Sequence, residues 1–164
     1  MPAAAVQTNA WAPTVLALLD HLQIERAHVC GLSLGGLTAL WLAARHPERL
    51  QRLVLADTAA RIGSTAGWEA RIAAVRAGGI EAVREAVVAR FLSAAFRARR
   101  PDVTQAVSAM LTGTDPVGYM AACAALRDAD LRAAVPTIRV PALIMAGALD
   151  AAVLGDLRLL YVAP

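Results

Sequence analysis

The sequence predicts an α/β fold: a short parallel sheet with flanking helices and a helical insertion before the last strand. Continuous apolar runs indicate buried strands at 27–30, 53–56 and 142–146. A helical segment separates the first two strands, and the stretch between the second and third is read as helical segments alone. Strands that alternate with helices in this way are typical of a doubly wound sheet.

The first part of the chain supplies two helices and two strands. Pro13 can open a helix whose leucines and valine repeat at helical spacing up to Leu22. The strand Ala27–Cys30 follows, and a buried helix then runs from Leu34 to His46. Pro47 ends this helix because proline lacks the N–H that would continue it.

Residues 61–136 predict four helices. Ser64 or Thr65 can cap the first, which ends at two glycines, and the second spans about 80–96. Prolines open the third and fourth, which cover about 101–113 and 116–127. We therefore predict a core formed by 1–60 and 137–164, and a helical cap formed by 61–136.

Composition and charge narrow the class of protein. At 164 residues and 58% hydrophobic content the chain can bury the core of about one domain. The net charge of +3 is modest, and the densest basic run, 97–100, suits a helix end better than a nucleic-acid surface. We therefore expect no nucleic-acid partner.

The two cysteines and the N-terminus indicate a cytoplasmic setting. Cys30 and Cys123 are too few for a disulfide framework and lack metal-ligand spacing, and Cys30 is expected to be buried in its strand. The first residues lack the charged and apolar regions of a signal peptide, and no stretch is a good membrane span. We expect no metal and no membrane partner.

A serine between two glycines marks the candidate catalytic position. Ser33 stands between Gly31 and Gly35, after a strand and before a helix, which is typical of the nucleophile elbow of α/β-hydrolases. The tight turn requires small residues at both glycine positions and holds the Ser33 hydroxyl above the carboxyl end of the strand. It also aims the Leu34 N–H at the place where an oxyanion forms.

Two aspartates compete for the role of the catalytic acid. Asp150 comes shortly after the 142–146 strand, and its order after Ser33 suits this fold. Asp57 follows the 53–56 strand and reaches the same edge of the sheet, although it also suits a loop or helix cap. We favour Asp150.

None of the three histidines is placed to act as the general base. His28 lies about 16 Å before Ser33 at strand rise, and His46 lies about 20 Å away at helical rise. His21 ends a helix at the opposite edge of the sheet. A general base must come within hydrogen-bond reach of the nucleophile, so we expect these histidines to be surface or end-of-element residues.

Three longer segments carry a resemblance to a known family. They are CGLSLGGLTALWLAARHPERLQRLVLADTAARIG, GWEARIAAVRAGGIEAV and GYMAACAALRDADLRAAVPTIRVPALIMAG. Together they resemble the 3-oxoadipate enol-lactonases, α/β-hydrolases of the β-ketoadipate pathway of aromatic compound catabolism. The resemblance covers about three quarters of the chain, from 28 to about 150, and the TAARIG and CAALRDADLR parts are its most specific.

The resemblance implies a lactone hydrolase that needs no metal or organic cofactor. It carries over Ser33 as nucleophile, Leu34 as oxyanion donor and Asp150 as acid. The family has further strands before the elbow and a histidine after the acid, so we expect this chain to be truncated at both ends and its activity to be impaired. The 27–30 strand then becomes an open edge, available for self-association.

The predicted cap offers residues that suit a lactone bearing carboxylates. Trp68 and Arg71 share a helix face, and an aromatic ring beside a guanidinium suits a flat ring with a carboxylate. A core tryptophan and a solvated arginine explain the same pair. Arg127 and Asp128 are weaker candidates. The alternative functions are another α/β-hydrolase, such as a carboxylesterase or a cofactor-free perhydrolase, and a non-catalytic remnant or binding module.

Overall fold

The computed structural model describes residues 11–150 of the 164-residue chain. Three parallel strands form a sheet in the order β1-β2-β3 within this part of the chain. The elements are, in order, α1 (Trp11–His21), β1 (Ala27–Leu32), α2 (Leu34–Arg45), a short 3-10 helix (Pro47–Arg49), β2 (Leu50–Ala56), α3 (Thr65–Gly78), α4 (Glu81–Phe91), α5 (Ala94–Arg99), α6 (Pro101–Thr112), α7 (Pro116–Asp128), a second 3-10 helix (Val135–Thr137) and β3 (Ala142–Met145).

The described chain forms two compact units, one containing residues up to 63 and from 125 onward, the other residues 64–124. The boundary therefore falls inside α7. The domain limits expected from the sequence, 61 and 136, stay predictions. Among the helices that the structure describes, from α1 to α7, none combines the length and the hydropathy of a membrane-spanning segment.

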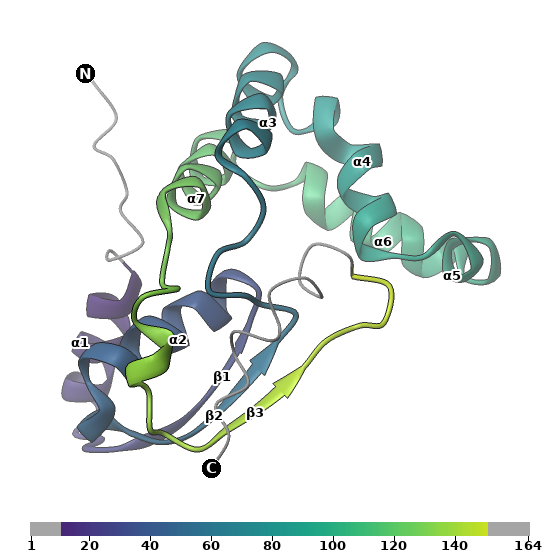
Figure 1. Ribbon diagram of the computed structural model, residues 1–164. Helices are drawn as coiled ribbons and strands as arrows, with labels where there is room; N and C mark the ends of the chain where they lie inside the picture. Colours follow the sequence, from purple (N-terminus) through teal and green to yellow (C-terminus); the bar gives the residue numbers. More distant parts are fainter. Residues whose placement is uncertain (1–10, 151–164) are drawn as a thin grey trace. The chain divides into compact units, whose positions relative to one another are not determined.

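In the first unit, α2 packs against β1 and β2, and α1 packs against α2 (Figure 1). Gly31 pairs with Leu55, and Leu55 pairs with Ile144. The register between β1 and β2 shifts once, between Ala27 and His28. Side chains on one face of a strand alternate with those on the other. Leu53 and Leu55 point into the packed face and are 2% exposed, which places the core between the sheet and α2.

The opposite face of the sheet is open in the described part of the chain, which corrects three sequence-based expectations. Cys30 was expected to be buried and is exposed. Leu53–Ala56 was expected to be covered on both faces, but Val54 and Ala56 are only half-buried. The third strand was also expected to be buried, yet Leu143 and Met145 are more than half exposed. The reason is that α1 and α2 cover one face only (Figure 1).

The open face combines polar and apolar side chains. A pocket there is lined by residues of all three strands, including His28, Cys30, Arg52 and Leu143. Within residues 11–150, β1 pairs with β2 alone. The open edge expected from the sequence stays a prediction.

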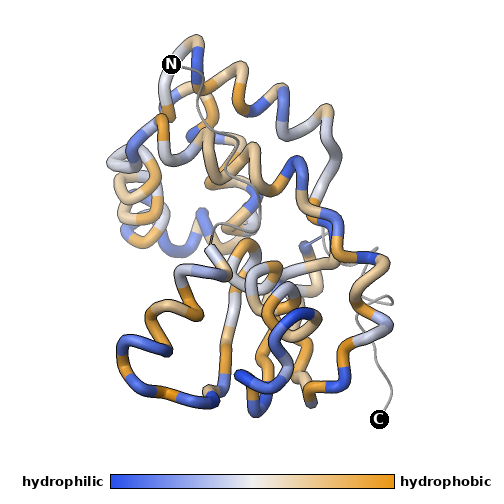
Figure 2. The backbone as a smooth tube through the Cα atoms, turned by 90° about the vertical axis from the view of Figure 1, so that its left-hand side faces the viewer, coloured by the Kyte–Doolittle hydropathy of each residue, from blue (hydrophilic) through white to orange (hydrophobic). Residues whose placement is uncertain are grey.

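The second unit consists of helices whose hydrophobic and hydrophilic residues alternate at short intervals (Figure 2). α3 and α4 bury some of these hydrophobic residues, whereas α5 and α6 bury none. Val75, Ile80, Val83 and Val87 form its buried cluster. Ser64 caps α3, because its hydroxyl accepts the Gly67 N–H at 3.1 Å. Of the two residues predicted as possible caps, Ser64 is therefore the cap and Thr65 is the first residue of the helix.

One predicted helix of the second unit is wrong. The helix expected at 80–96 is two helices, α4 and α5, because Leu92 is extended between them (φ −123°, ψ 120°). Ser93 accepts the Phe96 N–H at 3.2 Å and so begins a new helix. A serine that bonds nearby backbone offers the chain this alternative to helix continuation.

Candidate active site

Ser33 occupies a one-residue turn between β1, which ends at Leu32, and α2, which begins at Leu34. Its φ of 52° and ψ of −113° are uncommon for a residue with a side chain. The predicted strand-to-helix turn is therefore confirmed. Such a conformation costs free energy and persists only where the surroundings hold it in place.

The backbone of Ser33 is held from both sides. Its N–H donates to the Ala56 carbonyl at the end of β2, at 2.9 Å. Its carbonyl accepts the Leu37 N–H at 3.0 Å and the Thr58 hydroxyl at 2.8 Å. Its side chain makes no capping hydrogen bond to α2, although serine is a common N-cap residue. The hydroxyl is thus not used by the helix that it precedes.

The glycines around Ser33 confirm one part of the predicted packing and correct another. A Cβ on Gly31 would lie 2.3 Å from the Gly35 carbonyl oxygen, so a side chain is excluded there. A Cβ on Gly35 would have no described atom within 4 Å, so the expected crowding at that position is wrong. The crowded position is Gly36, whose Cβ would lie 2.5 Å from Cγ2 of Thr58. The turn therefore requires glycine at position 31, because the Gly35 backbone lies close to it, but a side chain at position 35 would meet no described atom.

Leu34 is the first residue of α2. The first N–H groups of an α-helix have no partner inside the helix, and they carry the positive end of its dipole. The Leu34 N–H therefore lies directly beside Ser33 at the end of a helix that favours negative charge. Its role as oxyanion donor stays a prediction.

The two acid candidates lie in neighbouring loops at the carboxyl ends of β2 and β3. Asp57 Oδ1 accepts the Gly147 N–H at 2.7 Å, and the Asp57 N–H donates to the Met145 carbonyl at 2.8 Å. Asp150 is half-buried, and its N–H donates to the Gly147 carbonyl at 2.9 Å. The Asp57 carboxylate thus holds the loop that carries Asp150. The choice of Asp150 as the acid stays a prediction.

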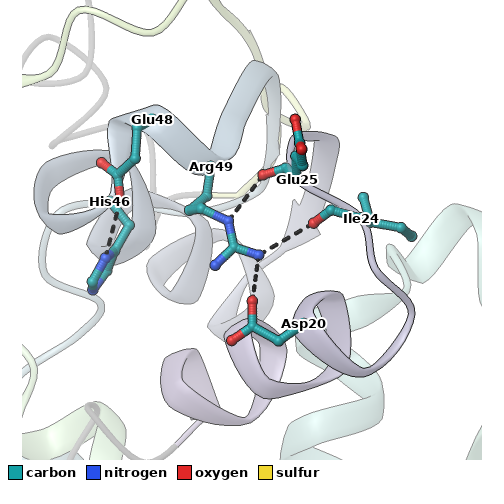
Figure 3. Close-up of polar contacts among 6 residues, drawn as sticks. All are labelled: Asp20, Ile24, Glu25, His46, Glu48 and Arg49. Carbon is teal, nitrogen blue, oxygen red and sulfur yellow. Dashed lines mark hydrogen bonds and ion pairs between the residues drawn. The ribbon is translucent and has the colours of Figure 1, made fainter.

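The histidines lie where the sequence predicted, away from the turn. His28 is the second residue of β1, and His21 is the last residue of α1. His46 caps the far end of α2, where its Nδ1 is 3.4 Å from a Glu48 carboxylate oxygen (Figure 3). Because α2 has 12 residues, His46 is separated from the turn by about 18 Å of helix.

Trp68 and Arg71 share one face of α3, as predicted. The Arg71 guanidinium carbon lies 5.1 Å from the Trp68 ring centroid, within the range of a cation–π contact. Trp68 is buried at 8% exposure, and Arg71 is half-buried. The placement of this pair above Ser33 stays a prediction.

Tyr119 and Cys123 of α7 belong to the same cluster, and the sequence analysis missed both. Burial raises the pKa of the Tyr119 hydroxyl, and the nearby Arg71 guanidinium partly opposes this rise. Burial likewise raises the pKa of the Cys123 thiol, again opposed by Arg71. The sequence could have indicated that these two residues lie together, because residues four apart on a helix share one face. We call Trp68, Arg71, Tyr119 and Cys123 the cap cluster.

Arg127 is already engaged by its neighbour. Its Nε and Nη2 donate to the two carboxylate oxygens of Asp128 at 2.7 and 2.9 Å. This hydrogen bond lowers the pKa of the Asp128 carboxyl. A bidentate partner of its own makes Arg127 a poorer candidate for a substrate carboxylate than Arg71.

Within residues 11–150, no group of three or more His, Cys, Asp or Glu side chains is arranged to hold a metal ion.

A family model for the alpha/beta hydrolase fold matches residues 10–156. With the elbow geometry, this match shows that the chain belongs to the α/β-hydrolase fold family.

Among the relatives, 3-oxoadipate enol-lactonase 2 of Acinetobacter baylyi is 40% identical over 136 residues, which are 83% of this chain and 51% of that protein. The enol-lactonase from Burkholderia xenovorans LB400 has a similar structure, with a TM-score of 0.90 at 41% identity over 94% of this chain and 60% of that one. A pimeloyl-[acyl-carrier protein] methyl ester esterase of Aromatoleum aromaticum is 37% identical over 88% of this chain and 64% of that protein. The chain spans about half the length of the enol-lactonase relatives it matches.

Proposed function

We propose that this chain provides the nucleophile and acid of a lactone hydrolase resembling 3-oxoadipate enol-lactonase. Ser33 is the nucleophile, the Leu34 N–H is an oxyanion donor and Asp150 is the acid. The observation that carries the proposal is the strained conformation of Ser33, held between β1 and α2 with no capping bond from its hydroxyl. The identity of 40% with an enol-lactonase supports the choice of substrate class.

The reaction that follows is acyl transfer through Ser33. The Ser33 Oγ loses its proton and attacks the lactone carbonyl carbon, the ring C–O bond breaks, and the released ring oxygen takes up a proton. Water then hydrolyses the acyl ester, and one of its protons returns to the Ser33 Oγ. The Leu34 N–H stabilises the negative charge on the carbonyl oxygen during both steps. No metal or organic cofactor takes part in the proposed mechanism.

The proposed mechanism lacks a base within these 164 residues. The sequence contains three histidines, and each lies at the end of an element away from the turn. A serine hydroxyl without an adjacent base remains protonated and is a poor nucleophile. We therefore propose that the isolated chain hydrolyses the lactone at a very low rate.

The cap cluster is the proposed site for a substrate carboxylate. Arg71 supplies the charge, Trp68 a flat apolar surface, and Tyr119 a hydroxyl beside the guanidinium. Arg71→Ala should raise KM for the enol-lactone more than for a neutral p-nitrophenyl ester, because only the first carries a carboxylate. Arg76→Ala, at an exposed position of the same helix, is the matched control. Equal effects of Arg71→Ala on both substrates would argue against this role.

A carboxylesterase is the second candidate, because the chain is 37% identical to a methyl ester esterase. Comparing kcat/KM for the enol-lactone with that for neutral esters distinguishes the two. A cofactor-free perhydrolase would require peroxide-dependent turnover, and a binding module would show none. A cytoplasmic setting remains part of the proposal.

Besides the small-molecule substrate, we propose a second copy of this chain as a partner. The proposed site of this self-association is the open edge of β1. An edge strand presents unpaired backbone groups, and a charged side chain on it discourages pairing. Sedimentation of the wild-type chain at rising concentration should show dimers or larger species, and Cys30→Lys should reduce them. A wild-type chain that stays monomeric throughout would remove this part of the proposal.

A chimera tests the proposed function. Residues 11–150 of this chain replace the matching segment of the Burkholderia xenovorans enol-lactonase, a 41% identical structure. The chimera should hydrolyse enol-lactone, and Ser33→Ala should lower kcat by about 10⁴-fold or more. Ser93→Ala, at the cap of α5, is the matched control and should leave kcat nearly unchanged. A chimera that folds and still turns over after Ser33→Ala would contradict the assignment.

A further inference from the structure

The two residues that follow β2 contact both halves of the candidate site. Thr58 hydrogen-bonds the turn that carries Ser33, and Asp57 hydrogen-bonds the loop that carries Asp150. Neither residue has been given a role in the reaction above. We call Asp57 and Thr58 the β2 bracket.

Thr58 is fitted closely against the turn. It is 1% exposed, and its hydroxyl donates to the Ser33 carbonyl at 2.8 Å. Its methyl carbon, Cγ2, would lie 2.5 Å from a Cβ on Gly36. The Ser33 carbonyl also accepts the Leu37 N–H, so it would keep one partner without Thr58. The Thr58 hydroxyl therefore gives the Ser33 carbonyl a second hydrogen bond, in addition to the helical bond from the Leu37 N–H.

Asp57 acts on the other side of the bracket. Its φ of 39° is positive, which is uncommon for a residue other than glycine and is tolerated best by Asn and Asp. This conformation accompanies two bonds to the end of β3: the N–H donates to Met145, and the carboxylate accepts from Gly147. Gly147 in turn accepts the Asp150 N–H. The Asp57 carboxylate therefore fixes the turn in which Asp150 stands.

We propose that Asp57 and Thr58 are positioning residues that set the Ser33 turn and the Asp150 loop at a fixed separation. The proposal rests on the roles proposed above for Ser33 and Asp150. A nucleophile and an acid that act through one base must be held to within a fraction of an ångström, and neighbouring hydrogen bonds supply that constraint. The bracket does so from two adjacent residues, one for each partner.

Amide hydrogen exchange in the 164-residue chain tests the Thr58 half without any need for activity. Thr58→Val removes the hydroxyl and keeps the shape, whereas Thr58→Ser keeps the hydroxyl and removes the methyl group. Thr58→Val should speed exchange at Ser33 and Leu37 by roughly fivefold, the size of one lost buried hydrogen bond. Thr58→Ser should leave the rates at these two amides near those of the wild type. Equal rates in the two variants would overturn the Thr58 role.

The Asp57 half has its own matched pair. Asp57→Asn keeps an oxygen acceptor for the Gly147 N–H, and Asp57→Ala removes it. Asp57→Ala should speed exchange at Gly147 and Asp150 by roughly fivefold or more, because the lost bond has a charged acceptor and such bonds are stronger than neutral ones. The exchange rate at Ser33 should not change, because the Asp57 carboxylate bonds the other loop. If Asp57→Ala does not fold, Gly147→Pro removes the donor instead and should loosen Asp150 in the same way. A uniform change across the chain would indicate a general structural role and overturn the bracket.

The chimera gives the kinetic consequence and separates the two proposals. Thr58→Val and Asp57→Ala should lower kcat by roughly tenfold or more with KM nearly unchanged, because both act on geometry and not on binding. Thr58→Ser and Asp57→Asn should restore most of kcat. A chimera without any turnover would count against the proposed function alone, since the exchange rates still decide the bracket. Normal kcat in Thr58→Val and Asp57→Ala would overturn the bracket and leave the function standing.

Discussion

The two ends of α2 differ in how the chain is held. At its N-terminus, Ser33 has a positive φ and is surrounded by closely packed backbone and the buried Thr58. At its C-terminus, His46 has a negative φ, and its N–H bonds regularly to Leu42. Arg49 then joins this end to the turn after α1, with three hydrogen bonds to Asp20, Ile24 and Glu25 (Figure 3).

The two ends therefore differ in kind: one is held by side-chain hydrogen bonds, and the other carries the residue proposed as the nucleophile. At the C-terminal end, the Arg49 side chain makes three hydrogen bonds, so we expect each bond there to contribute to folding. The Ser33 end holds a conformation that costs free energy, and strain that the fold retains is a signal of function. Three of the four predictions below alter one end of α2 and leave the other as it is, and the fourth concerns a carboxylate outside α2.

The largest effect is expected at Gly31. Gly31→Ala should lower the free energy of unfolding by about 3 kcal/mol, because the new methyl group would meet the Gly35 carbonyl with no room to move. Gly35→Ala is the control, since its methyl group meets no described atom and alanine favours a helix. Urea unfolding followed by circular dichroism measures both. Comparable losses in the two variants would show that the turn is not crowded at Gly31.

A gain in stability is expected from removing the side chain of Ser33. Ser33→Gly should raise the free energy of unfolding by about 1–2 kcal/mol, because glycine adopts a positive φ without steric cost. Ser33→Ala should not, because alanine keeps the same strain. The same denaturation experiment detects the gain. If glycine and alanine have equal effects, Ser33 is not strained and the contrast between the two ends fails.

The far end of α2 should affect stability alone. Arg49→Met should lower the free energy of unfolding by about 1 kcal/mol, because its three hydrogen bonds are lost while most of its apolar stem is kept. Arg49→Lys should recover little, since an ammonium cannot reproduce the fork of a guanidinium. Hydrogen exchange at Ser33 and Leu37 should be unchanged in both. Faster exchange there would mean that the two ends are coupled.

The smallest effect is expected on the pH dependence of stability, through Asp130. This residue precedes Leu131, and the Leu131 N–H donates to the carbonyl of Ala60, two residues after Thr58. Arg132 lowers the pKa of the Asp130 carboxyl to about 2. A lowered pKa adds stability above the unfolded value near 4, and this stability is lost as the pH falls toward 2. Because Asp130 is 41% exposed, we expect about 0.5 kcal/mol after solvent screening.

Unfolding of wild type and Asp130→Asn between pH 6 and pH 2 measures this contribution. The two curves should differ at pH 6 and converge near pH 2. A difference that grows as the pH falls would have the wrong sign and would contradict the lowered pKa of Asp130.

The fold was largely predictable because its strands and helix stops are local signals. The apolar runs located all three strands, although β1 and β2 are longer than predicted, by Gly31–Leu32 and Leu50–Arg52. These extra residues pair with the neighbouring strand, and pairing depends on partners distant in sequence. The break at Leu92 was missed because Val87 and Val88 continue the helical pattern up to it.

The site was predictable at Ser33 and less so around it. A glycine motif identified the turn, but only three-dimensional packing distinguishes the crowded Gly36 from the open Gly35. Thr58 carries no motif, and its role depends on a contact across 25 residues. The exposure of Cys30 was missed for a similar reason: a strand sequence indicates apolar residues but not which sheet face is covered.

The central claim is that one end of α2 is prepared for nucleophilic chemistry and that no histidine of this chain serves it. Enol-lactone hydrolysis by the purified 164-residue chain, measured beside the chimera, tests this most directly. We predict that the chain turns over at about one ten-thousandth of the chimera's rate or less, because Ser33 lacks a base. A chain that hydrolyses the lactone at an ordinary enzymatic rate, and loses that rate on Ser33→Ala, would place a base at Ser33 and contradict the account.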